Sequence, residues 1–271
     1  MTGGQARAGG GMLGRSRAVG YVPSRMKPVV VMLAYNVERT LARTFEALPA
    51  SLKPHVIVGD NCSTDRTNEV ARELGLRVVR HERNLGYGGN LKRLFKLFLE
   101  EGGDIVIEIH GDYQYEPSLA DLMIEYVARG HYDVIQGNRI RTRAEALAGG
   151  MPVYRYLGNR VLTLFENLWF GTTFGEWHSG MRAYAREVIA GLPFETYNDT
   201  HAFASDILMD CVSRGYRVAE VPCPVRYERD SSSVNVPNLF RYTFATVRAA
   251  LRHPPWRRAP PRPPRNGASM G

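Results

Sequence analysis

Three polar residues follow a short apolar run near the middle of the chain. Residues 105–109 read Ile-Val-Ile-Glu-Ile and predict a buried strand, and His110, Asp112 and Gln114 come shortly after it. A strand that ends in this way places a carboxylate and an amide at the carboxyl end of a sheet, where open α/β sheets bind ligands. Oxygen ligands of this kind suit Mg²⁺ or Mn²⁺, ions that can hold a diphosphate. The alternative for Asp112 is a carboxylate that caps a turn or helix.

A second group of reactive side chains lies in residues 175–184, which read Gly-Glu-Trp-His-Ser-Gly-Met-Arg-Ala-Tyr. A carboxylate or an imidazole can remove a proton from a hydroxyl group, and Glu176 and His178 are candidates for that step. Arg139 and Arg182 are fixed cations suited to phosphate. Each has a structural alternative: a hydrogen-bonded loop histidine for His178, and surface ion pairs for the two arginines.

The segments that must position these residues alternate between strands and helices. Apolar runs at 29–34, 55–59, 76–79, 105–109 and 133–137 predict strands, with helical patterns between them. This alternation predicts an α/β fold with a Rossmann-like, doubly wound, mostly parallel sheet and right-handed crossovers.

The pattern changes in the second half of the chain. Residues 141–149 are polar, and we expect them to form a mobile loop over the site. Long helices are predicted at 153–170, 203–214 and 237–252, with a strand at 217–222.

Polar residues also follow the other predicted strands. The first strand ends at 34–38 (Ala-Tyr-Asn-Val-Glu), and the second ends at Asp60 and Asn61, before Ser-Thr-Asp at 63–65. The carboxylate of Asp60 can accept N–H groups of a ligand, or it can cap a turn. A glycine-rich loop at 84–90 opens a helix where backbone N–H groups could face a phosphate, although glycines also serve tight turns.

Together these stretches resemble glycosyltransferase family 2, in particular the dolichyl-phosphate mannose/glucose synthase group, over about residues 29–245. The family's metal motif, Asp-x-Asp-x-Gln, corresponds to residues 110–114, and its acid before Ser-Gly-x-Arg-Ala corresponds to Glu176. The resemblance implies a GT-A fold and the inverting transfer of a sugar from a UDP- or GDP-linked donor. The acceptor would be a polyprenyl phosphate or a small hydroxylated molecule, and Mg²⁺ or Mn²⁺ would assist.

The resemblance also assigns roles to residues. Asp112 and Gln114 would hold the metal, while Glu176, His178 and Arg182 would be catalytic. Arg139 and Asp206 would contact the acceptor or a phosphate. The positions expected to bind the nucleotide are Ala34, Tyr35, Asn36, Glu38, Asp60, Asn61, Asn84, Gly88, Gly111 and Asp112.

Two positions depart from the family pattern. His110 replaces the first Asp of the metal motif and brings no negative charge for a cation, although an imidazole can bind phosphate or a metal. Ala204 stands where a further acid is expected, which leaves the acceptor open. For an alcohol acceptor Glu176 would act as the base. For an ionised lipid phosphate no base is needed, and Glu176 would order its loop or assist the metal.

The last predicted helix is basic and amphipathic. Phe244, Val247 and Leu251 share one side with other apolar residues, and Arg241, Arg248 and Arg252 follow at spacings of seven and four. Such a helix can lie on a membrane surface, pack on its own domain, or pack on a second subunit in a homodimer.

Composition limits the class of protein. The net charge of +8 comes from the tails: 1–28 and 252–271 carry ten basic residues and no acid, which leaves 25 basic and 27 acidic residues in 29–251. A nearly neutral core argues against nucleic-acid binding. We therefore expect one GT-A domain at 28–252 between a disordered basic tail at 1–27 and a disordered Pro/Arg-rich tail at 253–271.

Three widely separated cysteines, Cys62, Cys211 and Cys223, suggest reduced thiols in a cytoplasmic protein. No apolar run reaches the length of about 20 residues that a membrane helix needs, and no signal-peptide segment begins the chain. With a lipid acceptor, the expected place of work is the inner face of the cell membrane.

Two other classes remain as alternatives. A sugar nucleotidyltransferase shares a related sheet, but it would carry a Gly-rich basic loop where this chain has Ala34-Tyr35-Asn36. A nucleotide-sugar-binding protein without catalysis is the alternative that His110 raises.

Overall fold

A single mixed sheet forms the centre of the protein. The computed structural model describes residues 26–227, 236–263 and 265. Within them the strand order is β3-β2-β1-β4-β6-β5-β7, and every neighbouring pair is parallel except those that β6 makes with β4 and β5. The strands are β1 (Pro28–Ala34), β2 (Val56–Asp60), β3 (Arg77–Arg80), β4 (Ile105–His110), β5 (Val134–Asn138), β6 (Arg182–Ala185) and β7 (Val218–Pro222). This confirms the predicted mostly parallel, doubly wound sheet.

The antiparallel strand β6 was not predicted. Its four residues, Arg-Ala-Tyr-Ala, are all buried and show no strand alternation. Ala183 pairs with Ile107 of β4 on one side and with Ile135 of β5 on the other. Pairing with two distant segments, rather than any local pattern, makes this segment a strand.

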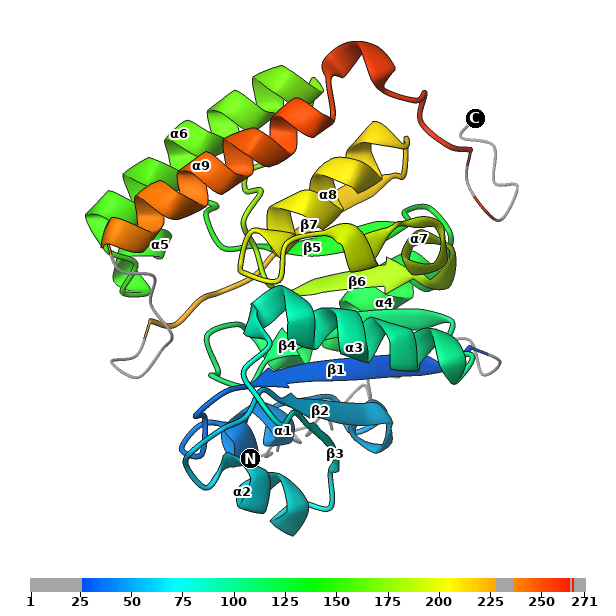
Figure 1. The fold of residues 1–271 in the computed structure, drawn as a ribbon, viewed down its shortest axis with the longest axis vertical. Coiled ribbons are helices and arrows are strands. Elements are labelled where there is room, and N and C mark those ends of the chain that lie inside the picture. Colours follow the sequence, from blue (N-terminus) through cyan, green and yellow to red (C-terminus); the bar gives the residue numbers. More distant parts are fainter. Residues whose placement is uncertain (1–25, 228–235, 264, 266–271) are drawn as a thin grey trace, which may run out of the picture.

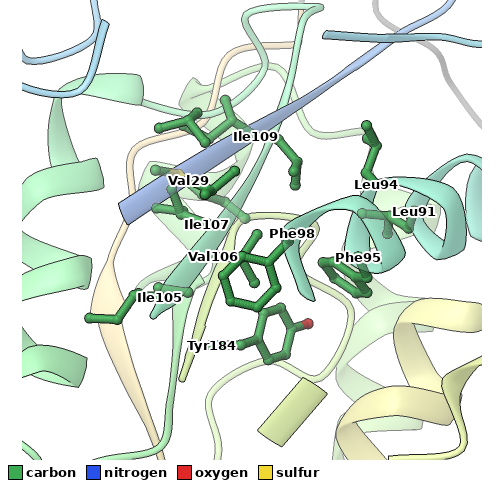
Figure 2. Packing of buried hydrophobic residues seen from close by; sticks show 14 of the residues in the cluster. Val29, Leu91, Leu94, Phe95, Phe98, Ile105, Val106, Ile107, Ile109 and Tyr184 are labelled. Carbon is green, nitrogen blue, oxygen red and sulfur yellow. The ribbon is translucent and has the colours of Figure 1, made fainter. Parts of the chain in front are cut away.

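Helices cover both faces of the sheet (Figure 1). Those before β6 are α1 (Leu41–Glu46), α2 (Thr67–Glu73), α3 (Gly86–Glu100), α4 (Ala120–Ala128), α5 (Arg143–Ala148) and α6 (Val153–Phe170). Those after it are α7 (Arg186–Gly191), α8 (Phe203–Ser213) and α9 (Val236–Arg252). Figure 2 shows Phe95 and Phe98 of α3 against Val106 and Tyr184 of the sheet, and all four side chains are fully buried.

The two long helices α6 and α9 lie side by side at one end of the molecule, beyond α8 (Figure 1). The indole N–H of Trp169 on α6 donates to the backbone oxygen of Ala250 on α9 (3.1 Å). The predicted bounds of α6 are confirmed. No helix in the described part of the chain combines the length and the apolarity needed to cross a bilayer.

Two segments differ from the expected loops and tails. Residues 143–148 form the short helix α5, capped by Thr142, rather than a mobile loop. Part of the tail expected to be disordered follows the domain surface: Ala259 N–H donates to the backbone oxygen of Ser213 (2.8 Å), and Arg262 N–H donates to that of Gly215 (2.9 Å). Backbone hydrogen bonds, which composition does not reveal, hold this part. Of the tail predicted at 1–27, residues 1–25 lie outside the described residues.

Candidate active site

The crevice outside β1 and β4 is where the direction of the sheet order reverses. The chain passes from β1 to β2 and β3 on one side and returns to β4 on the other, the position at which such sheets bind ligands. Asn36, Cys62 and Tyr113 have positive φ angles of 53°, 65° and 55°, and they lie shortly after β1, β2 and β4. Left-handed backbone at non-glycine residues is uncommon and gathers at functional sites.

The loop after β1 is braced against the loop after β2. Oδ1 of Asn36 accepts the backbone N–H of Thr64 (2.9 Å), and Oε2 of Glu38 accepts that of Arg66 (2.9 Å). Oδ2 of Asp65 accepts the backbone N–H of Glu38 (3.1 Å). Asn36, Glu38 and Asp65 help to line a hollow of about 350 Å³. The two predicted nucleotide-binding side chains therefore shape one edge of the crevice.

Asp60 and Asn61 are buried at the end of β2. Oδ1 of Asp60 accepts the backbone N–H of Ser63 (2.9 Å), and Oδ2 accepts from the amide of Asn68 (3.3 Å). Asp60 thus stabilises the turn into α2, the structural alternative that the sequence left open. The amide of Asn61 donates to Oδ1 of Asn84 (2.9 Å) and ties the loop after β2 to the glycine-rich loop.

Backbone groups complete this part of the crevice. The oxygen of Ala34 accepts the N–H of Asn61 (2.9 Å), and the N–H of Gly111 donates to the oxygen of Leu33 (2.8 Å). Tyr35 keeps 49% of its surface exposed. Ala34 and Gly111 therefore fix the strand ends, while Tyr35 is the side chain here that a ligand can reach.

The glycine-rich loop uses its backbone N–H groups within the protein. Gly86 N–H donates to Oδ1 of Asn84 (2.8 Å), and Gly88 N–H donates to the oxygen of Asp199 (2.7 Å). A Cβ atom at Gly88 would lie 2.3 Å from the oxygen of Asn198. This corrects the predicted role of Gly88, because its N–H group and its missing side chain serve close packing on residues 198–199 rather than a phosphate.

Asp112 and Gln114 are brought together by a strained turn. Tyr113 between them is left-handed, and Oδ1 of Asp112 accepts the backbone N–H of Gln114 (3.0 Å). The guanidinium groups of Arg43 and Arg226 lie 4.1 and 4.7 Å from the centre of the Tyr113 ring. These cation–π contacts stabilise the turn.

One carboxylate and one amide fit a cation that takes its remaining ligands from a diphosphate and water. Mg²⁺ is usually held in this way, through one or two carboxylates and the substrate phosphates. No group of three or more His, Cys, Asp or Glu side chains among residues 26–227, 236–263 and 265 is arranged to hold a metal alone. Asp112 and Gln114 are therefore suitable ligands for a metal shared with a bound diphosphate.

A cavity of about 150 Å³ adjoins Gln114 and is bounded by α6, α8 and α9. No Asp or Glu of the described residues lines it; its polar wall is made of aromatic, guanidinium and amide groups, the amides being those of Gln114 and Asn159. The aromatic and basic residues that line it are Tyr87, Tyr115, Tyr227, Tyr242, His110, His178, His201, Arg139 and Arg155.

His110 presents a buried ring nitrogen at this cavity. Its Nε2 has no hydrogen-bond partner in the described part of the chain. The ring packs beside Tyr87 and Tyr115, with centroids 5.6 and 5.3 Å apart. Burial lowers the pKa of His110 to about 4 despite the opposing charge of Asp112, so the imidazole is neutral at pH 7. His110 therefore brings neither a positive nor a negative charge to the metal position.

Glu176 is fully buried and paired with Arg139. Its carboxylate accepts the backbone N–H of Arg139 (2.9 Å), the Nε–H of Arg139 (2.8 Å) and the amide of Asn159 (3.1 Å). Burial would raise the pKa of Glu176, but the charge and hydrogen bonds of Arg139 outweigh it and lower the pKa. A carboxylate held in this way is a weak base, and it orients Arg139 at the cavity wall. This corrects the role expected for Glu176 with an alcohol acceptor.

Arg182 and Asp206 are structural in this arrangement. The buried guanidinium of Arg182 donates to the backbone oxygens of Trp177 (2.8 Å) and Ala204 (2.6 Å). Oδ2 of Asp206 accepts the backbone N–H of Asn198 (3.1 Å). Neither side chain lines the cavity, so neither is in a position to make the predicted contact with a substrate bound in it.

His178 does line the cavity, as a catalytic residue must. Tyr242 and Arg155 were not predicted as site residues, and they reach the same cavity from α9 and α6. Their helices were predicted, but the face each would turn toward the site depends on how the helices pack. The available signal was a tyrosine and an arginine on helices that have an apolar side.

A GT-A sheet with an Asp-x-Gln turn at its switch point defines a nucleotide-sugar-dependent glycosyltransferase. The model of glycosyl transferase family 2 matches residues 29–191, and the chain belongs to that family.

Two curated relatives are similar over most of the chain. An uncharacterised protein of Methanocaldococcus jannaschii is 28% identical over 220 residues, covering 80% of this chain and 90% of the relative. A dolichyl-phosphate hexose transferase of Haloferax volcanii is 29% identical over 199 residues, covering 73% and 82%.

A solved structure has the same fold. Glucosyl-3-phosphoglycerate synthase of Mycobacterium tuberculosis, in complex with Mg²⁺ and uridine diphosphate, superposes with a TM-score of 0.66 at 22% identity. The match covers 88% of this chain and 81% of that one.

Proposed function

We propose that the protein transfers a sugar, with inversion, from a nucleoside diphosphate sugar to a polyprenyl phosphate at an anionic membrane surface. The observation that carries the proposal is the position of the cavity. It lies between the Asp112–Gln114 turn on one side and α6 and α9 on the other. A donor diphosphate can therefore reach it from the sheet edge, and a lipid can reach it from the helices.

On the donor side, Asp112 and Gln114 would hold Mg²⁺ or Mn²⁺ against the diphosphate. A bound cation would neutralise the charge that develops on the leaving diphosphate. The braced loops at Asn36, Glu38 and Asn61 would enclose the nucleoside, with Tyr35 accessible beside them. The UDP of the structural neighbour and the dolichyl phosphate in the name of the relative support this class of donor and acceptor.

The cavity suits an anionic acceptor. Arg139 and Arg155 line it, and the described residues add no carboxylate to its wall. Arg139 donates through Nη2 to the backbone oxygen of His178 (2.9 Å) and through Nη1 to the Tyr227 hydroxyl (3.2 Å), which fixes its charge in place. The Arg139 side chain is 10% exposed, and a preorganised cation in such a buried setting attracts a phosphate more strongly than one in water.

The outer face of α6 and α9 suits the lipid. Leu157, Val161, Leu164 and Leu168 of α6 follow one another at spacings of four, three and four, and their exposure rises to 77% at Leu168. Phe244 on α9 is 71% exposed. The exposed charges on the described part of these helices are arginines, and the one acid, Glu166, is buried. An apolar face with only basic charge fits an anionic bilayer.

The transfer itself is tested with labelled sugar nucleotides. UDP- and GDP-linked hexoses would be incubated with polyprenyl phosphate in vesicles containing phosphatidylglycerol, with Mn²⁺ or with a chelator. We expect label in the lipid phase from one nucleotide only, and none with the chelator. Label confined to water-soluble products would contradict a lipid acceptor, and nucleotide binding without any release would leave a binding protein.

The membrane face is tested separately by vesicle flotation. The double variant Leu157→Glu/Leu164→Glu should lose binding to anionic vesicles while the fold and nucleotide binding remain. Leu122→Glu, at an exposed leucine on α4, is the matched control and should still float. If the wild-type chain is instead dimeric and does not float, the face belongs to a subunit contact.

A further inference from the structure

A buried polar chain joins three helices beside the cavity. Nε2 of His178 lies 3.1 Å from Oε2 of Glu166 on α6. On the other side of the ring, Nδ1 of His178 lies 2.8 Å from the hydroxyl oxygen of Tyr242 on α9. That hydroxyl also lies 3.1 Å from Oγ of Ser205 on α8.

Glu166 has no role in the site described so far. It is fully buried, and neither of its carboxylate oxygens makes a hydrogen bond of good geometry to any residue in the described ranges. Its contact with Nε2 of His178 is at a close ion-pair distance. Burial raises the pKa of Glu166, partly offset by the nearby His178. The other charged groups that act on it are Arg182 and, with the opposite sign, Glu176. A buried carboxylate destabilises the helix that carries it, which points to a use.

The contacts favour one tautomer of His178. An ionised carboxylate can only accept, so a hydrogen on Nε2 would face Oε2 of Glu166. Nδ1 would then accept from the Tyr242 hydroxyl. His178 and Tyr242 both line the cavity, while Glu166 lies behind them.

We infer that Glu166 is a positioning residue that enables His178 to take up the proton of the sugar acceptor bound in the cavity. Tyr242 relays this proton from the sugar acceptor to His178. The inference rests on the proposed transferase function. The acceptor O–H gives its proton to the Tyr242 oxygen as the Tyr242 proton moves to Nδ1 of His178. The acceptor oxygen forms its bond to the anomeric carbon, and the bond from that carbon to the diphosphate breaks, so the electron pair leaves with the nucleotide.

The driving force comes from the buried carboxylate beside the ring. A proton that moves to Nδ1 gives a cationic imidazole whose Nε2 lies 3.1 Å from Oε2 of Glu166, and an ionised carboxylate at that distance favours the charged ring. A phosphate monoester has a second pKa of about 6, so part of such an acceptor arrives as a monoanion that still carries a proton. An alcohol acceptor always does. The polar chain of Tyr242, His178 and Glu166 can therefore take a proton from a phosphate acceptor or from an alcohol acceptor.

The tautomer can be measured without any transferase assay. Ring ¹⁵N shifts of His178 in the wild-type protein should show hydrogen on Nε2 and a bare Nδ1 at neutral pH. Hydrogen on Nδ1 would overturn the inference whatever reaction the protein catalyses. A failed transferase assay with the expected tautomer would instead count against the proposed function.

The kinetic test uses Glu166→Gln and Tyr242→Phe, both close in volume to the wild-type side chain. We expect kcat to fall about 10²-fold in each, the scale of a lost general base. Because a neutral amide no longer favours a charged ring, the acid limb of the kcat profile should move to lower pH in Glu166→Gln. Glu73→Gln, at an exposed glutamate on α2, is the charge-matched control and should be unchanged.

Parallel pH profiles in the wild type and Glu166→Gln would overturn the inference, because a merely structural role would not move the acid limb. If Glu166→Gln fails to fold, Tyr242→Phe carries the test, since it leaves Glu166 and His178 in place. Wild-type kcat in folded Tyr242→Phe would likewise overturn it.

Discussion

The backbone N–H and the guanidinium of Arg139 both donate to the carboxylate of Glu176. The residue that follows β5 therefore binds this buried acid with both its main chain and its side chain. Glu176 is fully buried and the side chain of Arg139 is 10% exposed. The ion pair fixes the position of Arg139 at the wall of the cavity. It also ties the loop at 175–180 to the end of β5.

Arg139→Ala should destabilise the fold by about 3–5 kcal/mol, because it leaves the Glu176 carboxylate buried without its counter-charge. Urea unfolding monitored by circular dichroism measures this change. Arg141→Ala is the control two residues away. Arg141 pairs with Glu145 at the surface, where both side chains are nearly half exposed, so the expected cost is below about 1 kcal/mol. Equal costs for the two variants would show that burial does not decide the effect.

The same pair predicts a loss of stability in acid. The pKa of Glu176 lies below its ordinary value of 4.5 in the folded state, so the unfolded chain binds the proton first as the pH falls. The contribution of Glu176 is complete above about pH 4.5 and is lost as the pH falls through the lower folded-state pKa. The free energy of unfolding should therefore decline less steeply below pH 4.5 in Glu176→Gln than in the wild type. Superimposable slopes would contradict this.

Asp112→Ala should abolish the metal dependence of nucleotide binding. Calorimetric titration with UDP and with GDP, each with Mn²⁺ and with a chelator, measures it. We expect the wild type to bind one of the two nucleotides tightly only with the metal, since the cation links Asp112 to the diphosphate. Asp121→Ala, at an acid in the first turn of α4, is the control and should bind normally. Wild-type affinity that survives the chelator would place the diphosphate on His110 and the arginines instead.

Gly88→Ala should weaken nucleotide binding without touching the nucleotide. Its Cβ would meet the oxygen of Asn198 at 2.3 Å and Cβ of Phe203 at 2.7 Å, so the loop would have to move away from residues 198–199. Overpacking of this kind costs about 1–3 kcal/mol. Gly102→Ala is the control: its left-handed backbone makes it costly as well, but nothing lies within 4 Å of the added atom. Calorimetry should show normal affinity in the control and reduced affinity in Gly88→Ala.

The local order of the sheet and its polar strand ends could be predicted from the sequence alone. Apolar runs such as 29–34 and 105–109, each followed by polar turn residues, determine parallel buried strands whose ends meet at one edge. That pattern was sufficient to place Asp112 and Gln114 together and to indicate the family. The bounds of α6 followed from its helical period, because propensity and periodicity are local properties.

Which polar side chains are free to act depends on how the elements pack. Glu176 and Arg182 looked reactive as residue types, yet Glu176 is held by Arg139 and Arg182 by the backbone of Ala204, partners that pairing between distant segments brings close. Asp60 is held instead by Ser63 and Asn68 within its own turn. Glu166 and Tyr242 lie about 75 residues apart by number and meet at His178 because α6 and α9 pack side by side. Chemistry at a site depends on burial and on contacts across the fold, and a linear pattern carries neither.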